Sequence, residues 1–389
     1  MPETTLYDFG PTLRLMLTGL CLALGPLAWV WLRGRSSAPA QRLRTLTLLT
    51  LFLTFDLVLF GAFTRLSDSG LGCPDWPGCY GSASPLGARA EIAQAQAAMP
   101  TGPVTHGKAW IEMVHRYLAT GVGVLILTLA VATGWAVRKR SGAAAIPLSP
   151  WWPALTLLWV CLQGAFGALT VTMKLFPAIV TLHLLGGIGL LALLQAQASR
   201  YALAGGQAQM MVLPVPVRRV LLLAFVMLWL QIALGGWVST NYAVLACSEF
   251  PSCQGSAWPP MDFRQGFTLW RELGAAGDGG HISFAALTAI HYAHRLAAYA
   301  VMLVLLVLAG LLARDPASRR LGHWVLALVA WQFFSGLSNV ILGWPLVAAL
   351  AHTGGAAALV IVLSATICQS RSASSASVRH LTPASQPSA

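Results

Sequence analysis

Four histidines occupy matching positions in two halves of this 389-residue chain. They are His115 and His183 in the first half, and His294 and His352 in the second. Each lies about six residues into an apolar run long enough to cross a membrane as a helix. At 1.5 Å per residue, all four imidazoles would lie roughly 10 Å below the same membrane surface. Two imidazoles at one depth on two helices can face each other across a flat macrocycle, which is the arrangement of bis-histidine haem ligation.

A single histidine inside a membrane is often only a hydrogen-bond partner for a neighbouring helix. Four at repeat-related positions favour a functional role, because ionisable side chains are costly there. A zinc site needs four closely grouped ligands, whereas each half offers two. We therefore predict one haem iron in each half, ligated by His115 with His183 and by His294 with His352. The neighbouring His291 leaves open which histidine of its helix is the ligand, although the alignment of the repeats favours His294.

Charged residues accompany the first histidine of each half. Arg116 and Arg295 directly follow His115 and His294. Arginine pairs well with carboxylates, so both are predicted to bind haem propionates, and the alternative is that they extend to the lipid headgroups. Glu112 lies one helical turn outward from His115 on the same face. A carboxylate beside a haem is a candidate proton acceptor, and the alternative is an ordinary charge at a helix end. The counterpart of Glu112 in the second half is a histidine.

The elements that carry these residues form an internal repeat. Segment 61–82 recurs at 235–256, and the sequence IEMVHR at 111–116 recurs as IHYAHR at 290–295. Each repeat contains four apolar runs, at roughly 45–65, 110–137, 151–172 and 177–198, and then at 218–239, 286–313, 321–343 and 346–369. An even number of crossings places both repeats in the membrane the same way up, related by an axis near the membrane normal.

Composition sets the fold class. Hydrophobic residues make up 57% of the chain and charged residues 9%, whereas soluble domains carry about 25% charged residues. We predict an all-α polytopic membrane protein of two pseudo-symmetric four-helix bundles, with eight core transmembrane helices and one extra N-terminal helix. The expected units are this extra helix with a basic cytoplasmic loop (1–44), an N-terminal bundle (45–200), a C-terminal bundle (201–369) and a disordered cytoplasmic tail (370–389).

The net charge of +12 follows membrane topology and does not indicate nucleic-acid binding. Fifteen of the 24 Lys and Arg residues fall in loops on one side of the membrane, and five fall on the other. The positive-inside rule places the C-terminus in the cytoplasm and the long loops 66–108 and 240–285 outside. The long loops contain four of the seven cysteines, which are Cys73, Cys79, Cys247 and Cys253. An oxidising compartment outside the membrane permits disulfides there.

These motifs resemble a known family. TRLSDSGLGCPDWPGCYG at 64–81, with IEMVHR at 111–116 and HYAHR at 291–295, is similar to haem A synthases, and the resemblance covers about 45–369. It implies an enzyme that oxidises the C8 methyl group of haem O to a formyl group by successive hydroxylations, for cytochrome oxidase biogenesis. The extra N-terminal helix departs from the eight-helix pattern of the family.

The resemblance also implies roles for single residues. His294 and His352 match the ligands of a haem b cofactor, His115 and His183 match those of the substrate haem, and Glu112 matches the essential acidic residue. It implies a location in the inner (cytoplasmic) membrane. A homo-oligomer and a complex with haem O synthase and cytochrome oxidase assembly factors are suggested by the resemblance alone.

The resemblance pairs Cys73 with Cys79 and Cys247 with Cys253. One interpretation is that these are structural disulfides that stiffen the outer loops. The other is a redox role, in which Cys73 and Cys79 exchange electrons or transiently hold haem, since exposed short-loop disulfides are often labile.

Two other classes of function stay open at this point. A dihaem b-type electron carrier would have equivalent halves and no need for Glu112. A haem transporter or chaperone would return its haem unaltered. Analysis of the bound pigment separates these classes from the enzyme.

Overall fold

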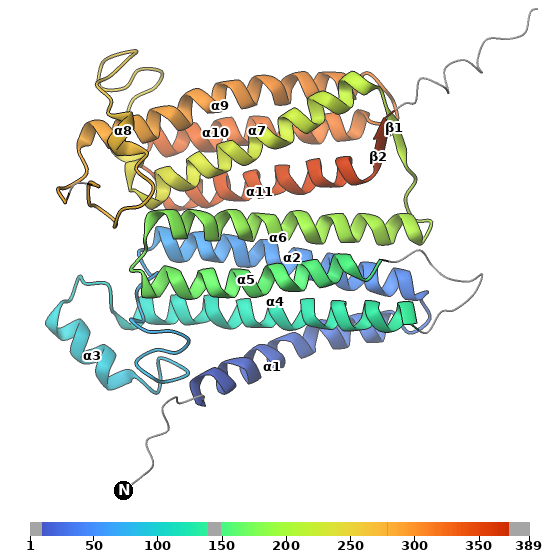
Figure 1. Ribbon diagram of the computed structural model, residues 1–389, viewed down its shortest axis with the longest axis horizontal. Coiled ribbons are helices and arrows are strands. Elements are labelled where there is room, and N and C mark those ends of the chain that lie inside the picture. Colours follow the sequence, from blue (N-terminus) through green and yellow to red (C-terminus); the bar gives the residue numbers. More distant parts are fainter. Residues whose placement is uncertain (1–9, 139–148, 278, 373–389) are drawn as a thin grey trace, which may run out of the picture.

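The computed structural model describes residues 10–138, 149–277 and 279–372. Within these ranges, nine helices are long and apolar enough to cross a membrane. They are α1 (Gly10–Arg33), α2 (Pro39–Leu66), α4 (His106–Arg138), α5 (Trp151–Thr172), α6 (Pro177–Ala204), α7 (Val215–Thr240), α9 (Phe284–Ala313), α10 (Arg319–Ile341) and α11 (Leu346–Cys368). All run roughly along one direction (Figure 1), and every span predicted from the sequence is present. The all-α polytopic membrane fold is therefore confirmed.

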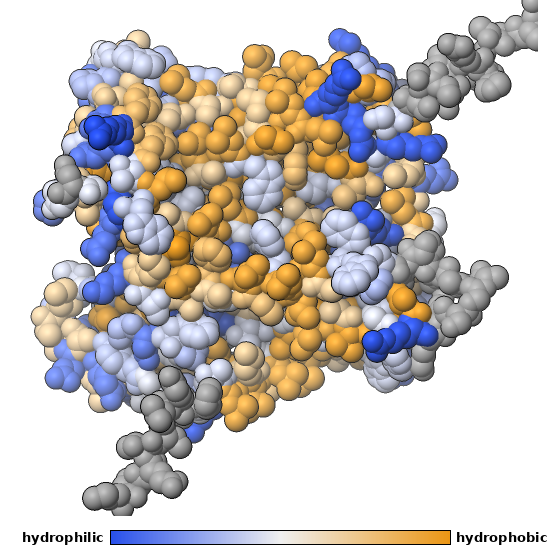
Figure 2. All heavy atoms as spheres, in the orientation of Figure 1, coloured by the Kyte–Doolittle hydropathy of each residue, from blue (hydrophilic) through white to orange (hydrophobic). Residues whose placement is uncertain are grey.

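The surface has the polarity of a membrane-spanning protein. On the face shown in Figure 2, apolar side chains cover the middle of the helices and polar side chains gather at the two ends. Threonine hydroxyls inside the spans find partners within their own helix. On α2, the buried hydroxyls of Thr47, Thr50 and Thr54 each donate to the carbonyl four residues earlier, at 2.7–2.8 Å. Such back-bonding satisfies a hydroxyl where no water is available.

The core consists of two four-helix bundles. In the first, α2, α4, α5 and α6 contact one another in a closed ring, so that α4 and α6 lie diagonally opposite. In the second, α7, α9, α10 and α11 form the same ring, with α9 and α11 opposite. The most buried span is α6, which also packs against α7 and α11 of the second bundle.

Equivalent positions of the two repeats meet at the end of the bundle interface that carries the long loops. Arg65 donates to the carbonyl of Ser239 at 2.6 Å, and the Tyr242 hydroxyl donates to the Asp68 carboxylate at 2.6 Å. Both pairs are separated by 174 residues, the offset of the sequence repeat. A residue lies beside its own counterpart only near a two-fold axis. The pseudo-two-fold axis therefore passes between the outer ends of α2 and α7.

The end of the molecule opposite the long loops is closed by a small parallel sheet (Figure 1). Strand β1 (Met211–Leu213) precedes α7 and pairs with β2 (Ser370–Ser372), which follows α11. Arg218 donates to the carbonyl of Ser370 at 2.5 Å and joins this strand to α7. The sequence assigns residues 370–372 to the tail. In the structure they form β2 and pair with β1 in the linker between the bundles. Residues 373–389 lie outside the described ranges, as do residues 139–148.

The two long loops contain short helices. The first contains α3 (Arg89–Ala98), and the second contains η1 (Ala243–Ala246) and α8 (Phe263–Gly266). Figure 1 shows α3 and α8 at the same end of the molecule, opposite β1 and β2. The two long loops therefore lie on one side, as the sequence predicts.

Helix α1 has no counterpart in the second repeat and packs mainly against α4. Gly19 makes this approach possible, because a Cβ there would lie 2.7 Å from Cβ of Thr120 and 2.9 Å from its backbone carbon. Leu15 is buried in a cluster that includes Cys73 and Cys79. This extra helix therefore supports both α4 and the first cysteine loop.

We predict that Gly19→Ala lowers the melting temperature of the full-length protein, because the added methyl group forces α1 away from α4 at a cost of about 1–3 kcal/mol. Gly25→Ala is the matched control, since a Cβ on Gly25 of the same helix meets nothing within 4 Å. Thermal unfolding in detergent measures both. Equal melting temperatures for the two variants would contradict the packing described here.

Candidate functional site

The structure brings the histidines together in the predicted pairs. His115 of α4 lies near His183 of α6 across the first bundle, and His294 of α9 lies near His352 of α11 across the second. All four histidines are of intermediate exposure, although the Nδ1 atoms of His115 and His183 are buried. Over the part of the chain that the structure describes, no three His, Cys, Asp or Glu side chains group as a metal site would require. Pairs of imidazoles on diagonal helices fit haem irons and do not fit zinc.

Each of these imidazoles packs on a glycine of an adjacent helix. The pairs, with the distance from an added Cβ to the imidazole Cε1, are Gly61–His115 (2.9 Å), Gly167–His183 (3.4 Å), Gly235–His294 (3.0 Å) and Gly336–His352 (3.1 Å). The glycines recur at the repeat offsets of 174 and 169 residues. A side chain at three of them would displace the ring, so the glycines form a cradle that fixes where each imidazole lies.

The structure distinguishes the two histidines of α9. His291 is buried, and its Nδ1 lies 3.1 Å from the carbonyl of Ala243 in η1. His294 is half-buried and faces the partner histidine on α11. These environments support His294 as the ligand and give His291 a role in holding the second outer loop.

Both cysteine pairs form disulfides, Cys73–Cys79 and Cys247–Cys253. All four cysteines are 0% exposed. A thiol reagent reaches a buried sulfur only after local opening, so the burial supports the structural interpretation over the redox one.

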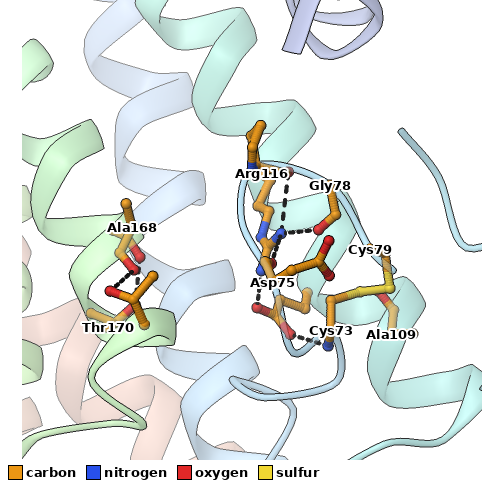
Figure 3. A network of polar contacts seen from close by, with 12 residues as sticks. Cys73, Asp75, Gly78, Cys79, Ala109, Arg116, Ala168 and Thr170 are labelled. Atoms are coloured by element: carbon orange, nitrogen blue, oxygen red, sulfur yellow. Dashed lines mark hydrogen bonds and ion pairs between the residues drawn. A yellow bond between two sulfur atoms is a disulfide. The ribbon is translucent and has the colours of Figure 1, made fainter. Parts of the chain in front are cut away.

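Arg116 holds the first disulfide loop onto α4. Its Nη1 donates to the carbonyls of Asp75 at 3.0 Å, Pro77 at 3.2 Å and Gly78 at 2.5 Å (Figure 3). The Asp75 carboxylate in turn accepts the backbone N–H of Tyr80 at 2.6 Å. The tight loop leaves carbonyls without partners of their own, and the guanidinium supplies the donors.

Arg295 does the same in the second half. It donates to the carbonyls of Glu249 at 2.9 Å, Pro251 at 3.2 Å and Ser252 at 2.9 Å. Arg116 and Arg295 are both buried, so neither extends to the lipid headgroups. The loop carbonyls and, for Arg116, the Glu112 carboxylate engage the terminal nitrogens of both guanidiniums, which gives both arginines a role in holding the loops. Binding of haem propionates by these arginines stays a prediction.

Glu112 connects the loop, the arginine and the ligand helix. One carboxylate oxygen accepts from Arg116 Nη2 at 2.5 Å, and the other accepts from the backbone N–H of Cys73 at 2.8 Å. With 4% of its surface exposed, Glu112 is not an ordinary charge at a helix end. It places a buried carboxylate one turn outward from His115. The second bundle has the imidazole of His291 in place of this carboxylate, so the two sites differ in the group that can take up a proton.

Comparison with known proteins identifies the family of this chain. Residues 44–364 match the family model COX15-CtaA, described as cytochrome oxidase assembly protein. The chain belongs to this family. A protein of Shewanella oneidensis named Heme A synthase is 37% identical over 326 residues, covering 83% of this chain and 95% of the relative. Another of that name, from Methylobacterium sp., is 31% identical over 356 residues, covering 85% and 92%. A third, from Halalkalibacterium halodurans, is 26% identical over 318 residues, covering 80% and 90%.

The family match begins at residue 44, which leaves α1 outside it. The same helix lies outside the internal repeat. Both comparisons therefore separate α1 from the core of eight spans that carries the histidines.

The sequence did not reveal the residues that surround the imidazoles. Gly167 and Gly336 were not distinguished from the other glycines of the membrane spans. Gln332, which donates to the carbonyl of His352 at 2.9 Å, was recognised as repeat-related but given no role. Gln231 and Ser335, which contact the Nδ1 atoms of the second pair, were not singled out. The repeat offset was the signal that could have found the glycines.

We predict that Gly235→Val lowers haem affinity of the second bundle about tenfold or more, because the new side chain displaces His294 from its position. Gly310→Val on α9 is the control, since a Cβ at Gly310 meets nothing within 4 Å. Haem content after purification, measured by absorbance, compares the two. If Gly235→Val retained the haem content of the control, Gly235 would not be needed to hold His294 in position.

Proposed function

We propose that this protein is a haem A synthase, an oxidoreductase that converts the C8 methyl group of haem O to a formyl group for cytochrome oxidase biogenesis. One observation carries the proposal. The two bundles contain the same histidine pairs, but only the first places a buried carboxylate, Glu112, one turn from a ligand histidine. Two equivalent electron-carrying sites would not need this difference. The relatives named Heme A synthase, which align over nearly their whole length, give independent support.

In this proposal the first bundle takes haem O as its substrate, held by His115 and His183. The second holds haem b as a cofactor, ligated by His294 and His352. When bound there, the cofactor supplies one-electron redox chemistry, whereas the protein supplies ligation, orientation and proton handling. Placing the substrate in the first bundle follows from the position of Glu112.

The proton requirement explains why a carboxylate is needed. Conversion of a methyl group and one water to a formyl group releases four electrons and four protons. Two successive hydroxylations give a geminal diol, which loses water to the aldehyde. Glu112 takes up protons that are released on the side of the substrate haem nearer the long loops. Arg116 is a positioning residue, because its ion pair and its bonds to the cysteine loop keep the carboxylate one turn from His115.

The proposed location is the cytoplasmic membrane, with the two long loops outside and the C-terminus in the cytoplasm. The formed disulfides support an oxidising compartment for the loops. The excess of basic residues at the other end supports the orientation. Haem O synthase, cytochrome oxidase assembly factors and a second copy of this chain are the proposed partners.

Extraction and chromatography of haems tests the function. The full-length protein is purified from cells that supply haem O. We expect haem B together with haem A or hydroxylated haem O. Haem B alone, with the haem O supply verified, would favour an electron carrier or a transporter instead.

We predict that Glu112→Gln abolishes or severely slows haem A formation while haem O still binds, because glutamine keeps an acceptor for the N–H of Cys73 but cannot take up a proton. A loss of about 10²–10⁴-fold is typical for removal of a general base. Haem A formed per bound haem O measures the effect. Formation at the wild-type rate would exclude the proton role of Glu112.

A further inference from the structure

The two histidine pairs differ in the partners of their Nδ1 atoms. In the second bundle, Ser335 Oγ lies 3.0 Å from Nδ1 of His352, and the Gln231 amide lies 3.0 Å from Nδ1 of His294. In the first bundle, the buried Nδ1 atoms of His115 and His183 have no hydrogen-bond partner among the described residues. A histidine that binds iron through Nε2 carries its proton on Nδ1, so an acceptor at this atom sets the tautomer and the ring orientation.

The Ser335 hydroxyl is arranged to be that acceptor. It donates its own proton to the carbonyl of Trp331, one turn earlier on α10, at 2.7 Å. Its lone pairs are therefore available for the Nδ1 proton of His352. The backbone of His352 is also held, because Gln332 donates to its carbonyl at 2.9 Å. Ring and backbone of this ligand are thus both fixed by α10.

Gln231 completes the pair from α7. Its Nε2 donates to the carbonyl of His294 at 3.1 Å and lies 3.0 Å from Nδ1 and 3.4 Å from Nε2 of the same imidazole, whereas its Oε1 has no hydrogen-bond partner among the described residues. The oxygen and nitrogen of a glutamine amide are assigned from their partners. With iron on Nε2 of His294, rotation of the amide would bring the unpartnered Oε1 to the Nδ1 proton.

The first bundle lacks both groups. At the repeat offsets of 174 and 169 residues, Leu57 stands at the position of Gln231, and Phe166 stands at that of Ser335. Neither side chain has a hydrogen-bonding atom. The scaffold around the imidazoles is repeated, including the glycine cradle, whereas the acceptors for Nδ1 are present in one half only.

We propose that Ser335 and Gln231 make the second bundle the site of the resident haem, and that Leu57 and Phe166 leave the first pair able to exchange haem. An acceptor at Nδ1 makes the imidazole a stronger and better oriented ligand, and its removal typically weakens metal binding 10–100-fold. This inference rests on the proposed function, since it explains why one haem stays as a cofactor while the other enters as substrate and leaves as product.

The test measures haem release and redox potential. In a His183→Ala background, only the second bundle keeps both ligands. The full chain is loaded with haem B, and the haem is transferred to an excess of apomyoglobin. We expect Ser335→Ala and Gln231→Leu each to release haem about tenfold faster or more. We also expect a higher midpoint potential, because a weaker ligand stabilises ferric iron less.

Two controls separate this role from a general loss of structure. Ser338→Ala removes an exposed hydroxyl from the same helix, bonded only to the carbonyl of Phe334, and should release haem at the parental rate. Ser335→Thr keeps the hydroxyl and should restore slow release. In a His352→Ala background, Phe166→Ser should slow release from the first bundle.

The outcomes distinguish the inference from the proposed function. If the wild type forms haem A but Ser335→Ala and Gln231→Leu release haem at the parental rate with unchanged potential, the inference alone fails. If both variants release haem faster but the wild type never converts haem O to haem A, the proposed function alone fails.

Discussion

The bonds between an arginine and the carbonyls of a cysteine loop fix the rotation of the helix that carries the first histidine of each half. Arg116 follows His115 directly, so the two side chains leave α4 about 100° apart. With the guanidinium buried among loop carbonyls, the helix cannot turn without leaving a buried charge unpaired. The imidazole direction is set as a consequence. Arg295 and His294 repeat this arrangement on α9, and the disulfides keep the carbonyl-bearing loops in the shape that receives the guanidiniums.

This scaffold is common to both halves, and three differences beside the histidines bear on their chemistry. They concern residues on or next to the ligand helices, and the pairs are Glu112 with His291, Leu57 with Gln231 and Phe166 with Ser335. Glu112 offers a carboxylate for proton transfer where the second half has an imidazole. Gln231 and Ser335 can accept a hydrogen bond, whereas their counterparts Leu57 and Phe166 cannot. Two sites with one architecture can therefore hold similar macrocycles and still treat them differently.

The sequence predicted the spans, the repeat and the histidine pairs because each depends on a local signal. Apolar runs report membrane crossing directly, and histidines such as His183 are rare inside them. The role of Arg116 was not predictable, since its partners are backbone carbonyls whose positions depend on the folded loop. Among 37 glycines, Gly167 is marked only by the repeat offset that relates it to Gly336, because its role depends on the approach of an imidazole from another helix. The docking of α1 on α4 through Gly19 likewise depends on tertiary packing that hydropathy does not encode.

The contacts at the pseudo-two-fold axis bear on how such a chain arises. In a symmetric dimer of one half, a residue on the axis meets a copy of itself, so Arg65 would face arginine and Asp68 would face aspartate. Here Arg65 meets the Ser239 carbonyl and Asp68 meets the Tyr242 hydroxyl. Joining two copies in one polypeptide frees the axial positions to take different residues, which places a tyrosine hydroxyl opposite Asp68 instead of a second aspartate. The Asp68–Tyr242 bond is thus one that no homodimer of either half could make.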